Sequence, residues 1–237
     1  MKPNGLMKRF YKDVTVKAFE DSWCILLDTH TAKTPGGRTL AVPTKTLAMN
    51  IAHEWDRQDA FVNPDSMPLS CLANTCLETL LTQRQAMEAV TKSYLDADLL
   101  CYPADSPDSL VALQNKLWTP ERKWVKARYD SALNIAPGIM PVAQDPSVVA
   151  RLGRLVEDMD DWQFTAAQLL VSTTGSYVLM LGAMDRRLDA EAVIARAFLP
   201  ERHHMDIWGH DTDQENALAI RAANVHTAIN WLHALWA

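Results

Sequence analysis

Apolar and polar residues alternate over the first part of the chain with the two-residue period of a β-strand. Val14, Val16 and Ala18 are separated by polar neighbours, as one buried face of a strand requires. Residues 20–22 (Glu-Asp-Ser) are typical of a hairpin turn, and residues 23–27 supply a returning strand. The pattern predicts a β-hairpin near the beginning of the chain.

A second turn is predicted at Thr34-Pro-Gly-Gly37. Proline fixes φ at the first central position, and glycine accepts the positive φ that often follows. Leu40 and Val42 then indicate a short third strand that ends at Pro43. The backbone amides of this turn could hold a phosphate together with Arg38. However, no strand leads from here into a glycine-rich helix start, so we favour the simple turn.

From Thr44 onward the apolar period lengthens to that of an α-helix. Leu47, Ile51 and Trp55 fall on one helical face, which predicts a helix that begins after Thr44. The prolines within residues 62–68 end this helix, because proline lacks the amide hydrogen that a helix interior needs. A second helical stretch follows, in which apolar residues recur at steps of three or four.

This change of pattern predicts the architecture. The class is α+β, with a small strand-rich α/β domain at residues 1–66 and a larger all-helical domain at residues 67–237. The first helical stretch of the second domain begins at Leu69 and is expected to reach Leu99. No internal repeat and no low-complexity tract is present.

Later helices are announced by residues that cap helix N-termini. Ser106-Pro107, Thr119-Pro120 and Asp145-Pro146 each place a capping oxygen before a proline suited to the first turn. Thr212 with Glu215 fits a capping box for the last helix. That helix carries an apolar stripe that must be buried against another element: Leu218, Ala222, Val225, Ile229, Leu232 and Trp236.

The most apolar segment runs from Ala166 to Met184. Gln168 and the run Ser172-Thr-Thr-Gly-Ser176 interrupt it, whereas a membrane span needs about 20 mostly apolar residues. We therefore expect one buried central helix and no stable insertion into a membrane. The small residues at 174–176 suit close helix packing, since the Gly-x-Ser-x-Gly pattern of a hydrolase nucleophile is absent.

Charge and composition exclude several classes of function. The formal net charge is −6 and the basic residues are dispersed, so we expect no binding to nucleic acid. The cysteines have neither metal-binding nor redox spacing and are expected to be reduced; they are Cys24, Cys71, Cys76 and Cys101.

The N-terminal charges bear on localisation. No apolar signal core follows Lys2, Lys8, Arg9 and Lys12, and the long Arg- and Ser-rich stretch of an organelle presequence is missing. This favours a bacterial cytoplasm. A processed protein of the mitochondrial matrix would look the same.

Residues 201–213 hold the densest group of chemically active side chains: three histidines, four carboxylates and a Trp-Gly pair. One hypothesis is a metal-dependent hydrolase, because three converging N or O ligands suffice for a catalytic zinc site. Its candidate ligands are His203, His204, Asp206, His210 and Asp211. The other hypothesis is a polar surface without a metal, since neither His-x-x-x-His nor His-Glu-x-x-His spacing occurs.

Four of the eight tryptophans stand beside strongly polar residues: Trp55, Trp118, Trp124 and Trp208. Such rings offer a large rigid contact area with a polar handle, which suits a protein interface. The alternative is that each ring lies at the edge of the core. For Trp208, this would mean anchoring a solvated connector between helices.

Short sequence blocks in a fixed order extend over about 200 residues. They are Arg9-Phe-Tyr-Lys12, Leu27-Asp28, Lys33-Thr-Pro-Gly36, Ile51-Ala-His-Glu-Trp-Asp-Arg-Gln58, Asn63-Pro-Asp-Ser-Met-Pro-Leu69, Asn74-Thr75, Asp98-Leu-Leu-Cys-Tyr102, Gln114 with Trp118, Gly138-Ile-Met-Pro-Val142 with Gln144, Thr174-Gly-Ser176 and Trp208-Gly209. In this order the chain resembles the assembly chaperones of the F-type ATP synthase that hold its unassembled α subunit.

The resemblance implies an N-terminal α/β domain, a C-terminal helical domain, no catalysis and no cofactor. It also implies that the partner is the α subunit of the F-type ATP synthase, held over the apolar surface that the β subunit later occupies. An acidic element precedes Trp-Gly in this family, and it falls on Glu201 here. Release would follow when β competes for the same surface.

The chain departs from the family pattern within the same segment. Pro200 stands where an acidic residue is common, and His204 stands where glutamine is usual, four positions before the tryptophan. The acidic position after Trp-Gly is Asp213, one methylene shorter than glutamate.

Together these features give the predicted site. The partner-binding residues are Glu201, Trp208, Gly209, Asp211, Asp213 and Trp55. We predict no catalytic residue, no metal ligand and no bound cofactor. We expect the free protein to be a monomer.

Overall fold

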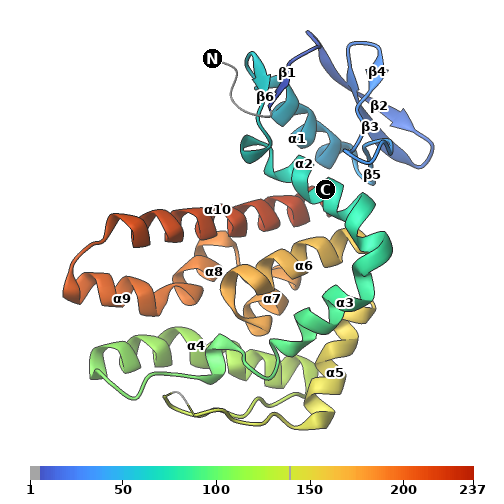
Figure 1. Ribbon diagram of the computed structural model, residues 1–237. Coiled ribbons are helices and arrows are strands. Elements are labelled where there is room, and N and C mark those ends of the chain that lie inside the picture. Colours follow the sequence, from blue (N-terminus) through green and yellow to red (C-terminus); the bar gives the residue numbers. More distant parts are fainter. Residues whose placement is uncertain (1–5, 139) are drawn as a thin grey trace. The chain divides into compact units, whose positions relative to one another are not determined.

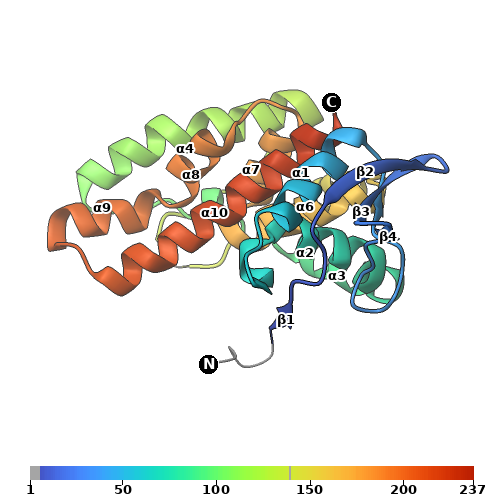
Figure 2. The same cartoon turned by 90° about the horizontal axis from the view of Figure 1, so that it is seen from above.

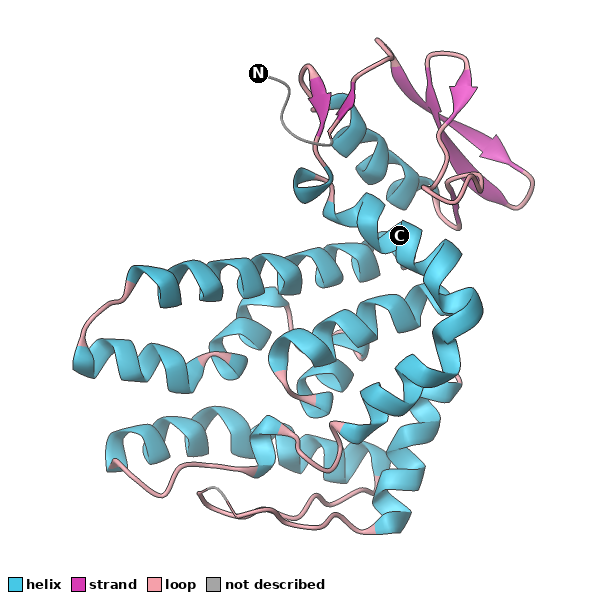
Figure 3. Cartoon of the chain, viewed as in Figure 1, coloured by secondary structure: helices cyan, strands magenta, loops and turns pink. Residues whose placement is uncertain are grey.

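The computed structural model describes residues 6–138 and 140–237. Lys2 and Ile139, the latter part of the block at 138–142, lie outside the described residues. Strands occur only in the N-terminal region, and the rest of the described chain is helical (Figure 1, Figure 3). The predicted α+β class is confirmed.

The chain forms two compact units. Unit 1 comprises residues 1–84, 161–165 and 230–237, and unit 2 comprises residues 85–160 and 166–229. Each unit is therefore assembled from segments that are distant in the sequence. The domain boundary between residues 66 and 67 stays a prediction.

An antiparallel sheet opens unit 1. β2 (Val14–Phe19) and β3 (Ser22–Leu27) form the predicted hairpin, with Val14 opposite Leu27 and Phe19 opposite Ser22. β4 (His30–Thr31) and β5 (Ala41–Val42) both pair with β3, so the third strand is also confirmed. A separate pair is formed by β1 (Met7–Lys8) and β6 (Phe61–Val62).

The turn between β4 and β5 forms as the sequence predicts. The Gly37 amide donates to the Thr34 carbonyl at 2.9 Å, and Gly37 has φ +86°, which a side chain would disfavour. Gly36 lies against Glu78, whose Oε1 accepts the Gly36 amide at 2.5 Å. A β-carbon at Gly36 would meet that carboxylate oxygen at 2.5 Å, so a larger residue here would displace the Glu78 side chain.

α1 (Lys45–Asp56) covers the sheet of unit 1. The Thr44 hydroxyl caps it by accepting the Leu47 amide at 3.1 Å, and Leu47 and Ile51 are buried against the strands. The helical stretch predicted from Leu69 forms, but it ends at Ser93 and does not reach Leu99. It consists of α2 (Pro68–Asn74), a π-helical turn η2 (Thr75–Thr79) and α3 (Leu80–Ser93), and the short helix η1 (Pro64–Ser66) precedes it.

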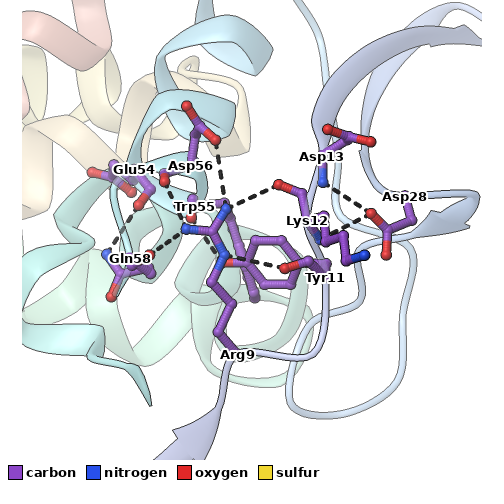
Figure 4. A network of polar contacts seen from close by, with 9 residues as sticks. All are labelled: Arg9, Tyr11, Lys12, Asp13, Asp28, Glu54, Trp55, Asp56 and Gln58. Atoms are coloured by element: carbon purple, nitrogen blue, oxygen red, sulfur yellow. Dashed lines mark hydrogen bonds and ion pairs between the residues drawn. The ribbon is translucent and has the colours of Figure 1, made fainter. Parts of the chain in front are cut away.

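Arg9 ties the N-terminal segment to the end of α1 (Figure 4). Its guanidinium donates to the main-chain carbonyls of Asp56 and Gln58, and to those of Tyr11 and Lys12 on its own segment. The Tyr11 hydroxyl donates to the Trp55 carbonyl at 2.7 Å. These bonds explain why two of the sequence blocks, at 9–12 and 51–58, occur together, since they fix the backbone around Trp55.

Unit 2 is built of helices. α4 (Asp108–Tyr129) packs against α7 (Tyr177–Met184), α8 (Ala190–Ala197) and α9 (Leu199–Trp208). Trp118 is fully buried on α4 and donates from its indole nitrogen to the Arg196 carbonyl at 2.9 Å. Trp118 therefore lies inside the core and not at its edge, as the alternative had it.

The predicted helix start at Thr119-Pro120 is wrong, because both residues lie inside α4. A proline inside a helix costs about 3 kcal/mol. The helix continues because buried residues on both sides of it, Trp118 and Val125, need helical spacing. Buried Glu121 adds two ion pairs to arginines of other segments.

The starts of two other helices, α4 and α10, differ from the predicted starts by one or two residues. α4 begins at Asp108, and Ser106 makes no cap there, because its hydroxyl bonds to the Asp105 carboxylate. α10 (Thr212–Leu235) is capped by Asp211, whose Oδ1 accepts the Gln214 amide at 2.9 Å. The predicted cap at Thr212 is therefore one residue too late.

The start of α5 (Pro146–Glu157) is as predicted, because Asp145 accepts the Ser147 amide at 2.7 Å. The stripe of α10 is buried only in part: Val225, Ile229 and Leu232 are buried, whereas Leu218, Ala222 and Trp236 are half-buried. In the part of the chain that the structure describes, no helix has the length and apolar character to cross a membrane.

The single helix expected from Ala166 to Met184 is wrong: α6 (Asp161–Thr174) and α7 are separated at Gly175, which has φ +70°. Ser176 caps α7 and donates to Asp98, a fully buried carboxylate. Asp98 also accepts the amides of Leu100 and Val178. Thus the small residues serve a helix break and a buried polar cluster.

Burial raises the pKa of Asp98 to about 6, although the accepted hydrogen bonds act in the opposite direction. In the unfolded chain an aspartate titrates near about 3.9. The unfolded state therefore loses its proton first. The contribution of Asp98 to stability is complete below about pH 4 and is lost as the pH rises through about 6.

We predict that Asp98→Asn lowers the free energy of unfolding by about 1–3 kcal/mol, because an amide NH₂ then faces backbone donors. The difference from wild type shrinks as the pH rises from about 4 to about 6. Urea unfolding at several pH values measures both effects. Asp96→Asn, an exposed neighbour, is the control; an equal loss there, or a difference independent of pH, contradicts the prediction.

Candidate partner-binding site

α9 presents two chemically different faces. Leu199 and Met205 are buried, and His203 is also buried, where its Nε2 forms a hydrogen bond with the Ser109 hydroxyl at 2.9 Å. The opposite face carries Glu201 and His204. This pattern makes α9 an amphipathic helix rather than the solvated connector considered from the sequence.

Gly209 ends α9 abruptly. Its φ is +98°, and its amide donates to the Met205 carbonyl at 2.9 Å. The preceding side chains are left in solvent: Trp208 is 77% exposed and Ile207 is 51% exposed. The alternative in which Trp208 anchors this segment to the core is therefore wrong, and a tryptophan exposed to this degree is a candidate contact residue.

The segment after Gly209 is fixed by its own hydrogen bonds. Asp211 caps α10, so its carboxylate has a structural role at the helix N-terminus. His210 lies 2.6 Å from Glu215, measured from Nδ1 to Oε1. Asp213 is exposed in the first turn of α10, where a carboxylate interacts favourably with the helix dipole.

Arg221 of α10 joins the two helices. Its Nη1 lies 2.8 Å from Oε1 of Glu201, and its guanidinium lies over the Phe198 ring at 4.2 Å. Its Nε donates to the Thr173 carbonyl at 3.2 Å. α9 and α10 run side by side in both views (Figure 1, Figure 2). A groove of about 410 Å³ between them is lined by Pro200, Glu201, His204, Gln214, Ala217, Leu218 and Arg221.

The α9–α10 hairpin, defined here as residues 199–221, combines apolar and acidic surface. Ile220 is 65% exposed, which adds a third large apolar side chain to Ile207 and Trp208. The hairpin has five acidic residues (Glu201, Asp206, Asp211, Asp213, Glu215) against two basic ones (Arg202, Arg221). It is therefore suited to a partner surface that is apolar with basic groups around it.

A family model described as ATP12 chaperone protein matches residues 8–126. The crystal structure of Atp12 from Paracoccus denitrificans has a TM-score of 0.91 and 34% sequence identity to this chain, over 96% of this chain and 97% of that chain. The chain belongs to the ATP12 chaperone family. It is a chaperone of ATP synthase assembly, as the sequence resemblance predicted.

A second solved structure supports the same family assignment. The Atu1473 protein from Agrobacterium tumefaciens gives a TM-score of 0.91 and 33% identity, over 97% of this chain and 87% of that chain. The family model ends at residue 126, whereas both structural matches include nearly the whole chain. The fold of this ATP12-family chaperone is therefore shared beyond the region that the family model describes.

The hydrolase hypothesis finds no support in this geometry. Within residues 6–138 and 140–237, no group of three or more His, Cys, Asp or Glu side chains could hold a metal ion. His203 is bonded to Ser109 and His210 to Glu215, so two of the candidate ligands have other partners. His204 faces the groove, and Asp211 caps a helix.

The predicted site residues fall into two groups. Glu201, Trp208, Gly209, Asp211 and Asp213 lie together on the α9–α10 hairpin, in unit 2. Trp55 belongs to unit 1, where it is half-buried and lines a different cavity. The remaining tryptophan considered, Trp124, is half-buried against Tyr129 and below the Arg187 guanidinium.

Arg221 and the exposed isoleucines were not predicted from the sequence. Ile220 lies outside the apolar stripe of α10, and an apolar residue outside such a stripe predicts exposed apolar surface. Ile207 precedes Trp208 and shares its exposure. Arg221 had no comparable signal, because Glu201 and Thr173 are distant from it in the sequence.

We predict unequal costs for breaking the Arg221 contacts. Glu201→Gln should change the free energy of unfolding by less than about 1 kcal/mol, since partly exposed ion pairs contribute little. Arg221→Ala should cost about 1–3 kcal/mol, because it also removes the contact with Phe198 and the bond to the Thr173 carbonyl. Urea unfolding compares the two; equal losses would show that Arg221 acts only through Glu201.

Proposed function

We propose that this ATP12-family chaperone binds the unassembled α subunit of the F-type ATP synthase through the α9–α10 hairpin. It covers apolar surface on α until the β subunit joins, and it carries out no reaction and needs no cofactor. The proposal includes a bacterial cytoplasm, or the mitochondrial matrix for a processed form, as the place where this occurs. The free chaperone is proposed to be a monomer.

The observation that carries the proposal is Trp208. Tryptophan is among the residues that contribute most to binding energy at interfaces, and isolated exposure of one costs solubility without benefit to the fold. Trp208 is the last residue of α9, which the Gly209 cap ends, so its backbone has helical geometry before binding. Ile207 and Ile220 are further exposed apolar side chains of the same hairpin.

The acidic residues contribute selectivity. Glu201 and Asp213 are exposed enough to meet basic groups of a partner, and such charges act mainly on association rate and partner choice. Asp211 contributes by fixing the hairpin rather than by contact, because its carboxylate is occupied in capping α10. Gly209 likewise contributes its backbone conformation.

We predict that Trp208→Ala weakens capture of the α subunit by about 30-fold, equivalent to about 2 kcal/mol, with no change in stability beyond about 0.5 kcal/mol. The measurement is the amount of soluble α that co-purifies with the tagged chaperone when both are expressed without β. Phe19→Ala, another exposed aromatic residue, is the control. Capture by the Trp208 variant at wild-type stoichiometry would refute the role of the hairpin.

A charge reversal tests the acidic rim. Glu201→Lys should abolish capture while the protein stays folded, because repulsion replaces attraction at the partner surface. Glu191→Lys reverses an exposed carboxylate on α8 and should leave capture intact. The double variant Glu201→Arg with Arg221→Glu keeps the ion pair inside the hairpin. If it captures α like the wild type, the ion pair matters rather than the position of the carboxylate.

A further inference from the structure

Unit 1 contains a cavity of about 550 Å³, and its lining residues differ in chemical character from the acidic α9–α10 hairpin. We name it the Trp55 cavity; its lining includes Val62 and Met67, and also Lys33, Trp55, Cys71 and Asn74. Its size is that of pockets that take one or two side chains or a small molecule, and its lining is mainly apolar with a few polar groups. Four of the sequence blocks that carry the family resemblance contribute to it, at 33–36, 51–58, 63–69 and 74–75.

The Trp55 indole nitrogen is buried and has no hydrogen-bond partner. A buried N–H without an acceptor costs about 1–3 kcal/mol, so such groups are rare and call for an explanation. The Trp55 backbone is fixed, because its carbonyl accepts the Tyr11 hydroxyl at 2.7 Å and its ring packs edge-on against the Tyr11 ring (Figure 4). The side chain as a whole is half-buried and forms part of the cavity wall.

The cavity lining itself carries positive charge, whereas the carboxylates of Glu54 and Asp65 lie outside the lining and near Cys71. Lys33 lies in the lining and is exposed, whereas no aspartate or glutamate is among the lining residues. Glu54 is close in sequence to Trp55, but its carboxylate is occupied by the Leu69 and Ser70 amides. An apolar ligand that carries acceptor oxygens would therefore be favoured over one that carries donors or positive charge.

The walls of the cavity are built by fixed contacts rather than by loose loops. Glu54 bonds to the N-terminus of α2, and Glu78 bonds to Gly36 of the 34–37 turn. The π-helical turn η2 begins immediately after Asn74, and π-helical turns are frequent at functional sites. A preformed cavity of this kind binds without the cost of ordering its walls.

We propose that the Trp55 cavity binds an extended segment of a client polypeptide, with one apolar side chain in the cavity and a main-chain carbonyl that accepts the Trp55 indole N–H after a small rotation of the ring. The Lys33 ammonium group donates to a further acceptor oxygen of the same segment. The identity of the client as a polypeptide rests on the proposed chaperone function. The cavity would give this chaperone a second contact, chemically different from the acidic hairpin.

The indole N–H itself reports occupancy. In the protein labelled with ¹⁵N at tryptophan, the Trp55 signal is assigned by its loss in Trp55→Phe. N-acetyl-leucine methylamide supplies one apolar side chain with carbonyl acceptors, and N-acetylglycine methylamide lacks the side chain. We expect the leucine compound to move the Trp55 signal downfield while the other seven of the eight tryptophan signals stay in place. No movement up to the solubility of the probe, or equal movement with the glycine compound, overturns the proposal.

The complex with the α subunit gives an independent test. Cys71 lines the cavity and is exposed, whereas Cys24, Cys76 and Cys101 are buried, so N-ethylmaleimide should modify Cys71 first. We expect capture of α to slow this reaction about tenfold or more, as followed by intact mass, with Cys71→Ser as the control for site. Trp55→Phe, which removes the indole N–H together with part of the ring, should weaken capture about fivefold.

The outcomes separate this proposal from the proposed function. If α is captured but Cys71 reacts at its free rate and Trp55→Phe captures normally, the cavity proposal fails and the hairpin account stands. If α is not captured at all, the proposed function fails, and the indole titration still decides whether the cavity binds an apolar peptide group.

Discussion

The exposed hairpin of this chaperone depends on the contacts of Arg221. The first part of α10 has no fully buried residue before Val225, and its apolar packing is limited to half-buried residues such as Leu218 and Ala222. Arg221 adds polar contacts to this packing, through an ion pair with Glu201, a ring contact with Phe198 and a hydrogen bond to the Thr173 carbonyl. A guanidinium suits this position because it offers several donors in one plane and can also stack on an aromatic ring.

This arrangement resolves a conflict that any chaperone surface faces. Apolar side chains must stay in solvent to meet a client, yet such residues normally favour burial or aggregation. Here Ile207, Trp208 and Ile220 are few, rigidly placed and interspersed with carboxylates, which keep the free surface soluble. The carboxylates are not equivalent. Asp211 caps α10, Glu201 is partly exposed while paired with Arg221, and Asp213 is exposed.

The fold was predictable where local signals decide it. The hairpin at β2 and β3, the turn at Thr34, and the helices capped by Thr44 and Asp145 follow from periodicity and capping chemistry. The failures are tertiary effects. Burial of Trp118 carries α4 through Pro120, and the bond between Ser176 and Asp98, 78 residues apart, accompanies the break between α6 and α7.

The site was partly predictable for a similar reason. Glu201 and the Trp-Gly pair were found by resemblance to a family, and the exposure of Trp208 could be known only once Gly209 was seen to end α9. Arg221 and the unpartnered Trp55 indole depend on contacts between distant segments, which periodicity does not contain. Sequence therefore identifies the kind of protein, and the three-dimensional contacts identify which of its residues are free to bind.

The central claim is that the α9–α10 hairpin contacts the unassembled α subunit. Amide hydrogen exchange, followed by mass spectrometry on the free chaperone and on its complex with α, measures this directly. The account predicts slower exchange in the complex at residues 199–221, with no comparable change in α5 or in the β2–β3 hairpin. A stable complex in which residues 199–221 exchange at their free rates would contradict it.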